Sequence, residues 1–369
     1  MNTNLKHLFT YVIIGGSLCI FGLSCIPLVS HSYTLGIFSQ SKTVQEILDN
    51  ESNMVPYKFS TVAFILDDYL RQGSLVLKNI VDKLGTGRTY HLTLSPDMLT
   101  AKQVADGAFD EEYKAFFHDI KQYNLKVLFR TMHEMNGGRY PRSSDPTHFK
   151  KAWQRVRDLS RSEGLDQKNI QFIFSFNIHD MPVLRGYEPG QHSKFFSCTP
   201  SRKTRTNCYT WEDYYNSGTV DILGFTIYNR GKATSNRLWL SFKDILNDPK
   251  RNQRNRILST KKPIYIDEVG TTAVWYEGNY EYQKSLSSYR RDSIRKSQRL
   301  NDLATTLDYT SEIIGVNYFN VDYTNGLRNP IIGEADWRFI DPQEGIMYSG
   351  GQSLLDRSDP IDMEFVFWR

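Results

Sequence analysis

Two glutamates of the sequence each follow a short apolar run, which is where a polar group stands at the end of a buried strand. Glu134 comes shortly after residues 126–131, and Glu268 comes directly after residues 263–267. In barrels of alternating strands and helices, the chemistry lies at the carboxyl ends of the strands. Two carboxyl groups that face each other there suit cleavage of a glycosidic bond, because one protonates the leaving oxygen while the other attacks the sugar or activates water. We therefore expect Glu134 and Glu268 to be catalytic.

A structural role is the alternative for each carboxylate, since a lone acidic residue after a strand is more often held in a salt bridge. Arg130 is a candidate partner, as is any neighbouring lysine. The occurrence of two such motifs, on the fourth and seventh expected strands, favours catalysis.

Two other hydrolytic chemistries lack their motifs. A zinc peptidase would need a second histidine three residues after Glu134, where Gly137 stands. A serine hydrolase would need a Gly-x-Ser-x-Gly elbow between a strand and a helix, and the sequence has none there. We therefore expect no metal ion and no other cofactor.

The elements that must position the two glutamates are apolar runs that alternate with amphipathic stretches. The runs are rich in Val, Ile, Leu and Phe, as expected of strands covered on both faces. They are Tyr33–Phe38, Thr61–Leu66, Tyr90–Leu94, Lys126–Thr131, Ile170–Phe176, Val220–Tyr228, Pro263–Asp267 and Ile313–Phe319. This alternation predicts an α/β protein, a single (β/α)₈ TIM barrel over residues 33–369. A doubly wound open sheet is the alternative, but no Gly-rich phosphate loop follows the first strand.

Helical spacing appears between the expected strands. Asp145 and Pro146 supply an N-cap and a first-turn proline, and the apolar residues that follow keep to one face: Phe149, Ala152, Trp153, Val156 and Leu159. Two further faces are formed by Leu77, Ile80, Val81 and Leu84, and by Phe116, Phe117 and Ile120. The long connection of residues 178–218 is expected to line the active site. No barrel helix is evident after Pro342.

The N-terminus has the pattern of an export signal. Lys6 and His7 precede the uncharged residues 8–29, and residues 30–32 offer a cleavage site of small residues. The uncharged stretch is also long enough to cross a bilayer, which takes about 20 residues. We therefore expect residues 1–32 to be a cleaved signal peptide or a membrane anchor. In both cases the barrel domain is extracytoplasmic, either secreted or anchored to the outer face of the membrane.

The positions of the cysteines agree with an exported domain. Cys19 and Cys25 lie in the N-terminal apolar segment, whereas Cys198 and Cys208 lie on a polar loop. We expect a disulfide between Cys198 and Cys208 in an oxidising compartment, with two free thiols as the alternative.

The net charge of the chain is +4, from 45 Lys and Arg against 41 Asp and Glu. The sequence has no recognisable nucleic-acid-binding motif beside this mild excess, so no nucleic-acid partner is expected.

At the two glutamate segments the chain resembles glycoside hydrolase family 26, best known for endo-β-1,4-mannanases. The family segment Arg-x-x-His-Glu-x-Asn-Gly is matched by Arg130, His133, Glu134, Asn136 and Gly137. The family's nucleophile segment is matched by Lys262, Pro263, Ile264, Ile266, Glu268 and Gly270. Strands five, six and eight add weaker similarity: Ser175 and Asn177, Val220–Phe225 with Tyr228 and Asn229, Tyr318–Asn320, and Asp336–Arg338. The similarity runs from about Gly36 to Asp341.

The resemblance implies a retaining mechanism through a covalent glycosyl–enzyme intermediate, with Glu134 as general acid/base and Glu268 as nucleophile. It also implies that the remaining matched residues serve the substrate or the two carboxylates: Tyr228 on the nucleophile, Arg130 and His133 as orienting groups, Asn136 and Asn177 in the sugar site, and Tyr140, Tyr318 and Trp337 stacked on pyranose rings. The expected partner is a polysaccharide or oligosaccharide substrate. A barrel that binds carbohydrate without cleaving it is the alternative.

Two departures from the family pattern bear on the substrate. Thr226 stands where many members carry Asp, two residues before Tyr228. Arg139 and Arg142 stand where members usually carry tryptophans. Because guanidinium groups bind carboxylates and phosphates in a bidentate way, these arginines favour an acidic exopolysaccharide over plain mannan, unless they pair with acids of the protein such as Asp145. We expect a β-linked polysaccharide that is mannan-like or acidic.

Overall fold

The computed structural model describes most of residues 33–358. The described residues are 33–38, 59–66, 73–94, 100–137, 140–179, 209–229, 240–249, 251–272, 274–276, 289–291, 293–321, 337–339 and 347–358. Residues 1–32, Arg139, Cys198 and Cys208 lie outside them, so the expected signal or anchor and the expected disulfide stay predictions. No helix within the described ranges is long and apolar enough to span a membrane.

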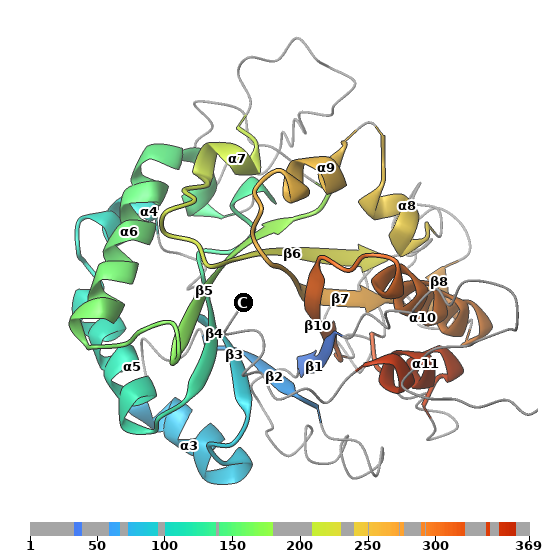
Figure 1. The fold of residues 1–369 in the computed structure, drawn as a ribbon, viewed down its shortest axis with the longest axis horizontal. Helices are drawn as coiled ribbons and strands as arrows, with labels where there is room; N and C mark the ends of the chain where they lie inside the picture. The colour runs from blue at the N-terminus through green and yellow to red at the C-terminus, as the bar shows by residue number, and fades with distance from the viewer. Residues whose placement is uncertain are drawn as a thin grey trace, which may run out of the picture.

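Eight parallel strands close into a barrel, which confirms the predicted fold (Figure 1). In barrel order each strand pairs with its sequence neighbours, and β10 closes the circle against β1. The strands are β1 (Thr34–Phe38), β2 (Thr61–Ile65), β3 (Thr89–Leu94), β4 (Lys126–Thr131), β5 (Ile170–Asn177), β6 (Ile222–Asn229), β7 (Ile264–Thr271) and β10 (Ile313–Phe319). The short strands β8 (Val274–Tyr276) and β9 (Tyr289–Arg291) form a separate antiparallel pair.

Helices surround the strands, as Figure 1 shows. They are α3 (Ser74–Leu84), α4 (Ala101–Ala105), α5 (Asp110–Gln122), α6 (Pro146–Ser162), α7 (Trp211–Tyr214), α8 (Phe242–Leu246), α9 (Gln253–Leu258), α10 (Ser293–Asp308) and α11 (Ser349–Arg357), with the 3₁₀ turns η1 (Met135–Gly137) and η2 (Pro141–Ser144) after β4. The main apolar core lies between this layer and the strands. A smaller cluster of Leu128, Ile173, Ile222 and Tyr265, with Ile314 packed on it, fills the barrel interior.

Helix α6 begins as the sequence predicts. The Asp145 carboxylate accepts a hydrogen bond from the backbone N–H of His148 at 3.0 Å, and Pro146 occupies the first turn, where no N–H is needed. The predicted apolar face is buried, including Phe149 and Trp153. This face holds α6 against the barrel behind β4 and β5, whose loops carry the candidate site.

Helix α11 was not expected from the sequence. Its second and third residues are Gly350 and Gly351, which are weak helix formers. The reason for Gly350 is close packing on α10, since a Cβ there would lie 2.1 Å from the carbonyl oxygen of Ser297. The hydroxyl of Tyr33 donates to the Leu354 carbonyl at 3.1 Å, which ties the end of the chain to the first barrel strand. Tertiary packing thus overrides local propensity here.

Candidate active site

A register shift in β7 turns two consecutive acidic side chains into the barrel. Side chains normally alternate between the two faces of a strand. Phe225 of β6 pairs with Ile266, but the next residue, Thr226, pairs with Glu268, so β7 has one extra residue at Asp267. Such a bulge re-aims the side chains around it. The predicted strand ended at Asp267; the observed strand continues to Thr271, and Glu268 lies within it.

Glu268 is buried and held by groups from two other strands. Only 7% of the residue is exposed. Arg130 of β4 donates through Nη2 to Oε1, and the hydroxyl of Tyr228 of β6 donates to Oε2. Arg130 is fixed in turn by a 2.7 Å hydrogen bond from Nε to the Thr93 hydroxyl on β3. Both carboxylate oxygens are therefore engaged by donors.

These contacts decide the charge of Glu268. Burial raises the pKa of a carboxyl group, but the Arg130 charge and the hydrogen bonds from Tyr228 and Arg130 outweigh it, so the pKa of Glu268 lies below its ordinary value. The pKa of Arg130 is raised, because the carboxylates of Glu268 and Asp267 more than offset the effect of burial. Glu268 is consequently an ionised carboxylate at neutral pH, as attack on a sugar requires.

Glu134 lies after β4 in an unusual backbone conformation. Its φ is 52°, in the left-handed region that non-glycine residues seldom adopt. The backbone N–H of Glu134 donates to the Ser175 carbonyl of β5 at 2.9 Å, which holds the segment in place. The residue is 8% exposed. Backbone strain of this kind clusters at functional sites, where the surrounding structure maintains it.

The side chain of Glu134 is oriented by neutral donors. Oε1 accepts hydrogen bonds from the Thr226 hydroxyl and, at 3.2 Å, from Nδ2 of Asn177. Thr226 and Tyr228 are two residues apart on β6 and so share one face. One strand thus contacts both candidate catalytic carboxylates. The sequence marked Thr226 only as a departure from the family's Asp, whereas the structure shows that its hydroxyl reaches Glu134 directly.

Asn136 has a different place from the one predicted. Its Nδ2 donates to the Asn177 carbonyl and its Oδ1 accepts from the Asn177 N–H, both at 2.8 Å. Asn136 is fully buried. This two-point clamp positions Asn177, whose side chain in turn bonds Glu134; the predicted contact of Asn136 with a sugar stays a prediction.

The three predicted stacking aromatics are also buried. Tyr318 is 0% exposed and packs edge-on against Phe339, with ring centroids 4.7 Å apart, so its ring offers no sugar platform. Trp337 is 1% exposed and lies 5.2 Å from the ring of Tyr228, which it supports. Gly270 makes this contact possible, since a Cβ there would lie 2.9 Å from Trp337 Cε3.

The third aromatic, Tyr140, lies beside the acid/base segment. It is 7% exposed, its ring centroid is 5.6 Å from that of His133, and the guanidinium carbon of Arg142 stands 3.7 Å above its ring. Arg142 is fully buried and donates from Nε and Nη2 to the His133 carbonyl at 3.2 and 3.1 Å. The expectation that Arg142 meets an acidic glycan is therefore wrong: this guanidinium fixes the backbone next to Glu134.

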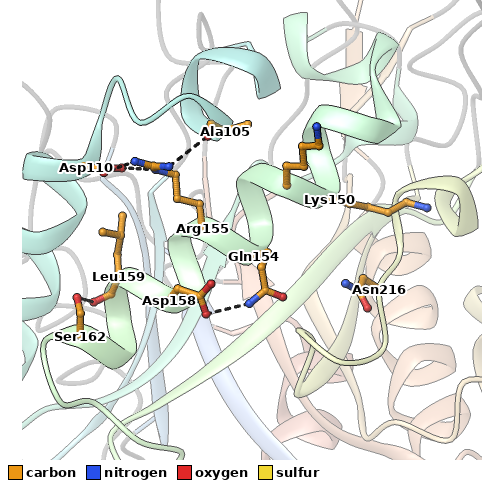
Figure 2. A pocket seen from close by; sticks show the side chains of 10 residues that line it. Ala105, Asp110, Lys150, Gln154, Arg155, Asp158, Leu159, Ser162 and Asn216 are labelled. Atoms are coloured by element: carbon orange, nitrogen blue, oxygen red, sulfur yellow. Dashed lines mark hydrogen bonds and ion pairs between the residues drawn. The ribbon is translucent and has the colours of Figure 1, made fainter.

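A surface pocket lies away from these residues, on the solvent face of α6 (Figure 2). Its volume is about 660 Å³. Arg155 there is paired with Asp110 by two hydrogen bonds of 2.7 and 2.6 Å, and Asp158 accepts from Gln154 at 2.9 Å. None of the described lining residues is aromatic. Four of its charged and amide side chains are thus paired with one another, and the barrel carboxylates remain the candidate site. The described residues also contain no group of three or more His, Cys, Asp or Glu that could hold a metal.

Comparison with known proteins supports the fold. No protein-family model matches the sequence, and no curated protein matches it. Among solved structures, the catalytic domain of a family 26 endo-β-1,4-mannanase from Bacillus sp. JAMB-750 is similar, with 15% identity, coverage of 88% of this chain and 85% of that chain, and a TM-score of 0.51. A β-mannanase from a symbiotic protist of the termite Reticulitermes speratus, complexed with gluco-manno-oligosaccharide, is 13% identical. The match covers 90% of this chain and 91% of that chain, with a TM-score of 0.50.

An endo-1,4-β-xylanase from Caldicellulosiruptor owensensis is similar as well, with 10% identity and a TM-score of 0.53. The match covers 89% of this chain and 98% of that chain. At such identities the likeness shows the (β/α)₈ barrel that these glycoside hydrolases share. The chemistry of this chain has to be argued from its own residues.

Proposed function

We propose that this protein is a retaining glycoside hydrolase that cleaves a β-linked polysaccharide, with Glu268 as nucleophile and Glu134 as general acid/base. The observation that carries the proposal is the environment of Glu268. Arg130 and Tyr228 bond both oxygens of this carboxylate and favour its anion, the form that attacks a sugar. Glu134, after β4, accepts hydrogen bonds from Thr226 and Asn177 and is the second carboxyl group that the reaction needs.

The reaction takes two steps. Glu134 gives its proton to the glycosidic oxygen while a Glu268 oxygen attacks the anomeric carbon, so the C–O bond to the leaving sugar breaks and a glycosyl ester forms. Glu134, now ionised, takes a proton from water as that water attacks the anomeric carbon. The ester bond to Glu268 breaks, and the second sugar leaves with its original configuration.

The substrate class follows from two lines of support. The two glutamate segments resemble family 26, best known for mannanases, which favours a mannan-like glycan. The barrel itself is as similar to that of a xylanase as to those of two β-mannanases. The burial of Arg142 withdraws one of the two arginines that favoured an acidic exopolysaccharide, which leaves Arg139 as the basis for that choice. The export expected from residues 1–32 agrees with either glycan. A polysaccharide does not cross a membrane unaided, so an enzyme that cleaves one has to lie outside the cytoplasm.

The test is a panel of soluble β-mannan, galactomannan, xylan and acidic polysaccharides, followed by analysis of released oligosaccharides. Wild type should release products from at least one glycan, and Glu268→Gln should release none while keeping its affinity for that glycan. Binding by wild type without any product would instead identify a non-catalytic carbohydrate-binding barrel.

A further inference from the structure

Asp267 is a buried carboxylate next to the nucleophile that the two-step reaction does not use. It is 0% exposed and enters the barrel through the β7 bulge. A Cβ on Gly224 of β6 would lie 2.0 Å from Asp267 Oδ2, so the glycine leaves the space that this carboxylate fills. Oδ1 lies 2.8 Å from Nε2 of His91 on β3, which is itself 1% exposed.

Arg130 is within electrostatic reach of both neighbouring carboxylates. Its Nη2 bonds Glu268, and the charge of Asp267 also acts on it. Within the part of the chain that the structure describes, Nη1 of Arg130 and Oδ2 of Asp267 have no hydrogen-bond partner. A donor and an acceptor thus remain unused inside the barrel. One guanidinium, that of Arg130, feels two consecutive acidic side chains.

We propose that His91 is a positioning residue for the nucleophile: it holds Asp267 on the β3 side of the barrel, so that Arg130 stays paired with Glu268 alone. This inference rests on the proposed function in naming Glu268 the nucleophile. Without the bond from His91, Asp267 turns to the free Nη1 of Arg130. The guanidinium is then shared by two carboxylates, and a second anion approaches Glu268.

The consequence appears in the ionisation of Glu268. The titratable groups that act on it are Arg130 from β4, Tyr228 from β6 and His91 from β3, and Asp267 precedes it on β7. Tyr265 of β7 lies against the Asp267–His91 pair, with its ring centroid 5.8 Å from that of His91. Sharing Arg130 weakens the cause that lowers the pKa of Glu268, and a nearby like charge raises this pKa further.

The experiment uses two substitutions of similar shape. His91→Gln retains an amide donor where Nε2 stands, whereas His91→Met removes the donor. The pH dependence of kcat/KM is measured on soluble galactomannan. His91→Gln should keep the acid limb of wild type, and His91→Met should move it upward by about 1–2 pH units. If the imidazole had only a structural role, the acid limb would move equally in both variants.

A double variant isolates Asp267 as the cause. In the Asp267→Asn background no second anion competes for Arg130, so adding His91→Met should leave the acid limb in place. An equal shift in both backgrounds would overturn the proposal. If His91→Met alone does not fold, the Asp267→Asn protein with and without His91→Met still gives a test, and an upward shift of the acid limb within that pair would overturn the proposal.

Crystal structures of the same variants give a readout that needs no activity. In His91→Met the Asp267 carboxylate should bond Nη1 of Arg130, and in His91→Gln it should remain on β3. Asp267 in its wild-type position in both structures would also overturn the proposal. A wild-type enzyme that hydrolyses nothing defeats the proposed function, and these structures still decide whether His91 keeps Asp267 away from Arg130.

Discussion

Arg130 and Glu268 lie 138 positions apart in the sequence, yet the guanidinium of Arg130 donates directly to the carboxylate of Glu268 inside the barrel. Both side chains are almost completely enclosed. A buried ion pair contributes little net stability unless further hydrogen bonds complete it. Here the Thr93 hydroxyl accepts from Nε of Arg130, and the Tyr228 hydroxyl donates to the second oxygen of Glu268, while Nη1 of Arg130 has no hydrogen-bond partner among the described residues. The arrangement is better explained as one that keeps an anion ready for reaction.

Tyr228→Phe should move the acid limb of kcat/KM upward. The pKa of Glu268 is lowered in the folded enzyme, so activity is present above that pKa and is lost as the pH falls through it. Removing the Tyr228 hydroxyl takes away one cause of the lowering. A hydrogen bond to a charged group contributes about 1.5–3 kcal/mol, so the limb should shift by about 1–2 pH units.

The matched control is Tyr113→Phe, which deletes a buried hydroxyl that bonds Thr131 at 2.8 Å outside the site. It should cost about 1 kcal/mol of stability and leave the acid limb where it is. An unshifted limb in Tyr228→Phe would mean that the tyrosine does not tune the nucleophile.

Thr226→Val should lower kcat about tenfold with little change in KM. The substitution keeps the shape of the side chain but removes the hydroxyl that donates to Glu134. Loss of about 1–1.5 kcal/mol of orientation corresponds to roughly tenfold in rate. Thr226→Ser retains the donor and should recover most of the activity. Equal activity of the Val and Ser variants would remove Thr226 from the account.

Gly270→Ala should reduce activity without unfolding the barrel. The new methyl group would stand 2.9 Å from Trp337 Cε3 and 3.2 Å from Tyr228 Cδ1, so Trp337 has to shift, and Tyr228, which contacts the nucleophile, has to give by a few tenths of an ångström. Misplacement of a catalytic group costs rate steeply, about a hundredfold for about 1 Å. Gly87→Ala, where a Cβ meets nothing within 4 Å, is the control and should retain wild-type kcat. Thermal melting of both variants separates loss of activity from loss of fold.

Asp221→Ala should destabilise the barrel by about 3–5 kcal/mol. Asp221 accepts two hydrogen bonds from Arg157 of α6, at 2.7 and 2.9 Å, and one from the Phe172 N–H of β5 at 2.8 Å. Its loss leaves a buried guanidinium without its anion. The control is Asp158→Ala, which breaks an exposed pair with Arg161 and should change the free energy of unfolding by less than about 0.5 kcal/mol. Denaturant titration measures the free energy of unfolding of both variants. Similar losses in the two would contradict a stabilising role of the Arg157–Asp221 pair.

The sequence predicts the barrel well because its strands are buried on both faces and therefore read as continuous apolar runs. It misplaces the end of β7, because Glu268, Gly270 and Thr271 are not apolar although they continue the strand. It misses α11, in which Gly350 allows close packing on α10.

The carboxylates and their tyrosine could be found from motifs, whereas the roles of other side chains depend on partners distant in sequence. The Asn136 clamp, the Arg142 bond to the His133 carbonyl and the burial of Tyr318 follow from tertiary packing. The pairing of His91 with Asp267, 176 positions away, likewise leaves no local signal.

The identity of the nucleophile is tested most directly by trapping the covalent intermediate. A 2-deoxy-2-fluoro-β-mannosyl fluoride, or the analogue of whichever sugar the polysaccharide panel selects, slows hydrolysis of the glycosyl ester so that it accumulates. Mass spectrometry of the digested protein should then find the added sugar on the peptide that contains Glu268, at that residue, and wild type should regain activity as the ester turns over. A sugar attached to a different residue, or no adduct on an enzyme that hydrolyses its polysaccharide, would contradict the account.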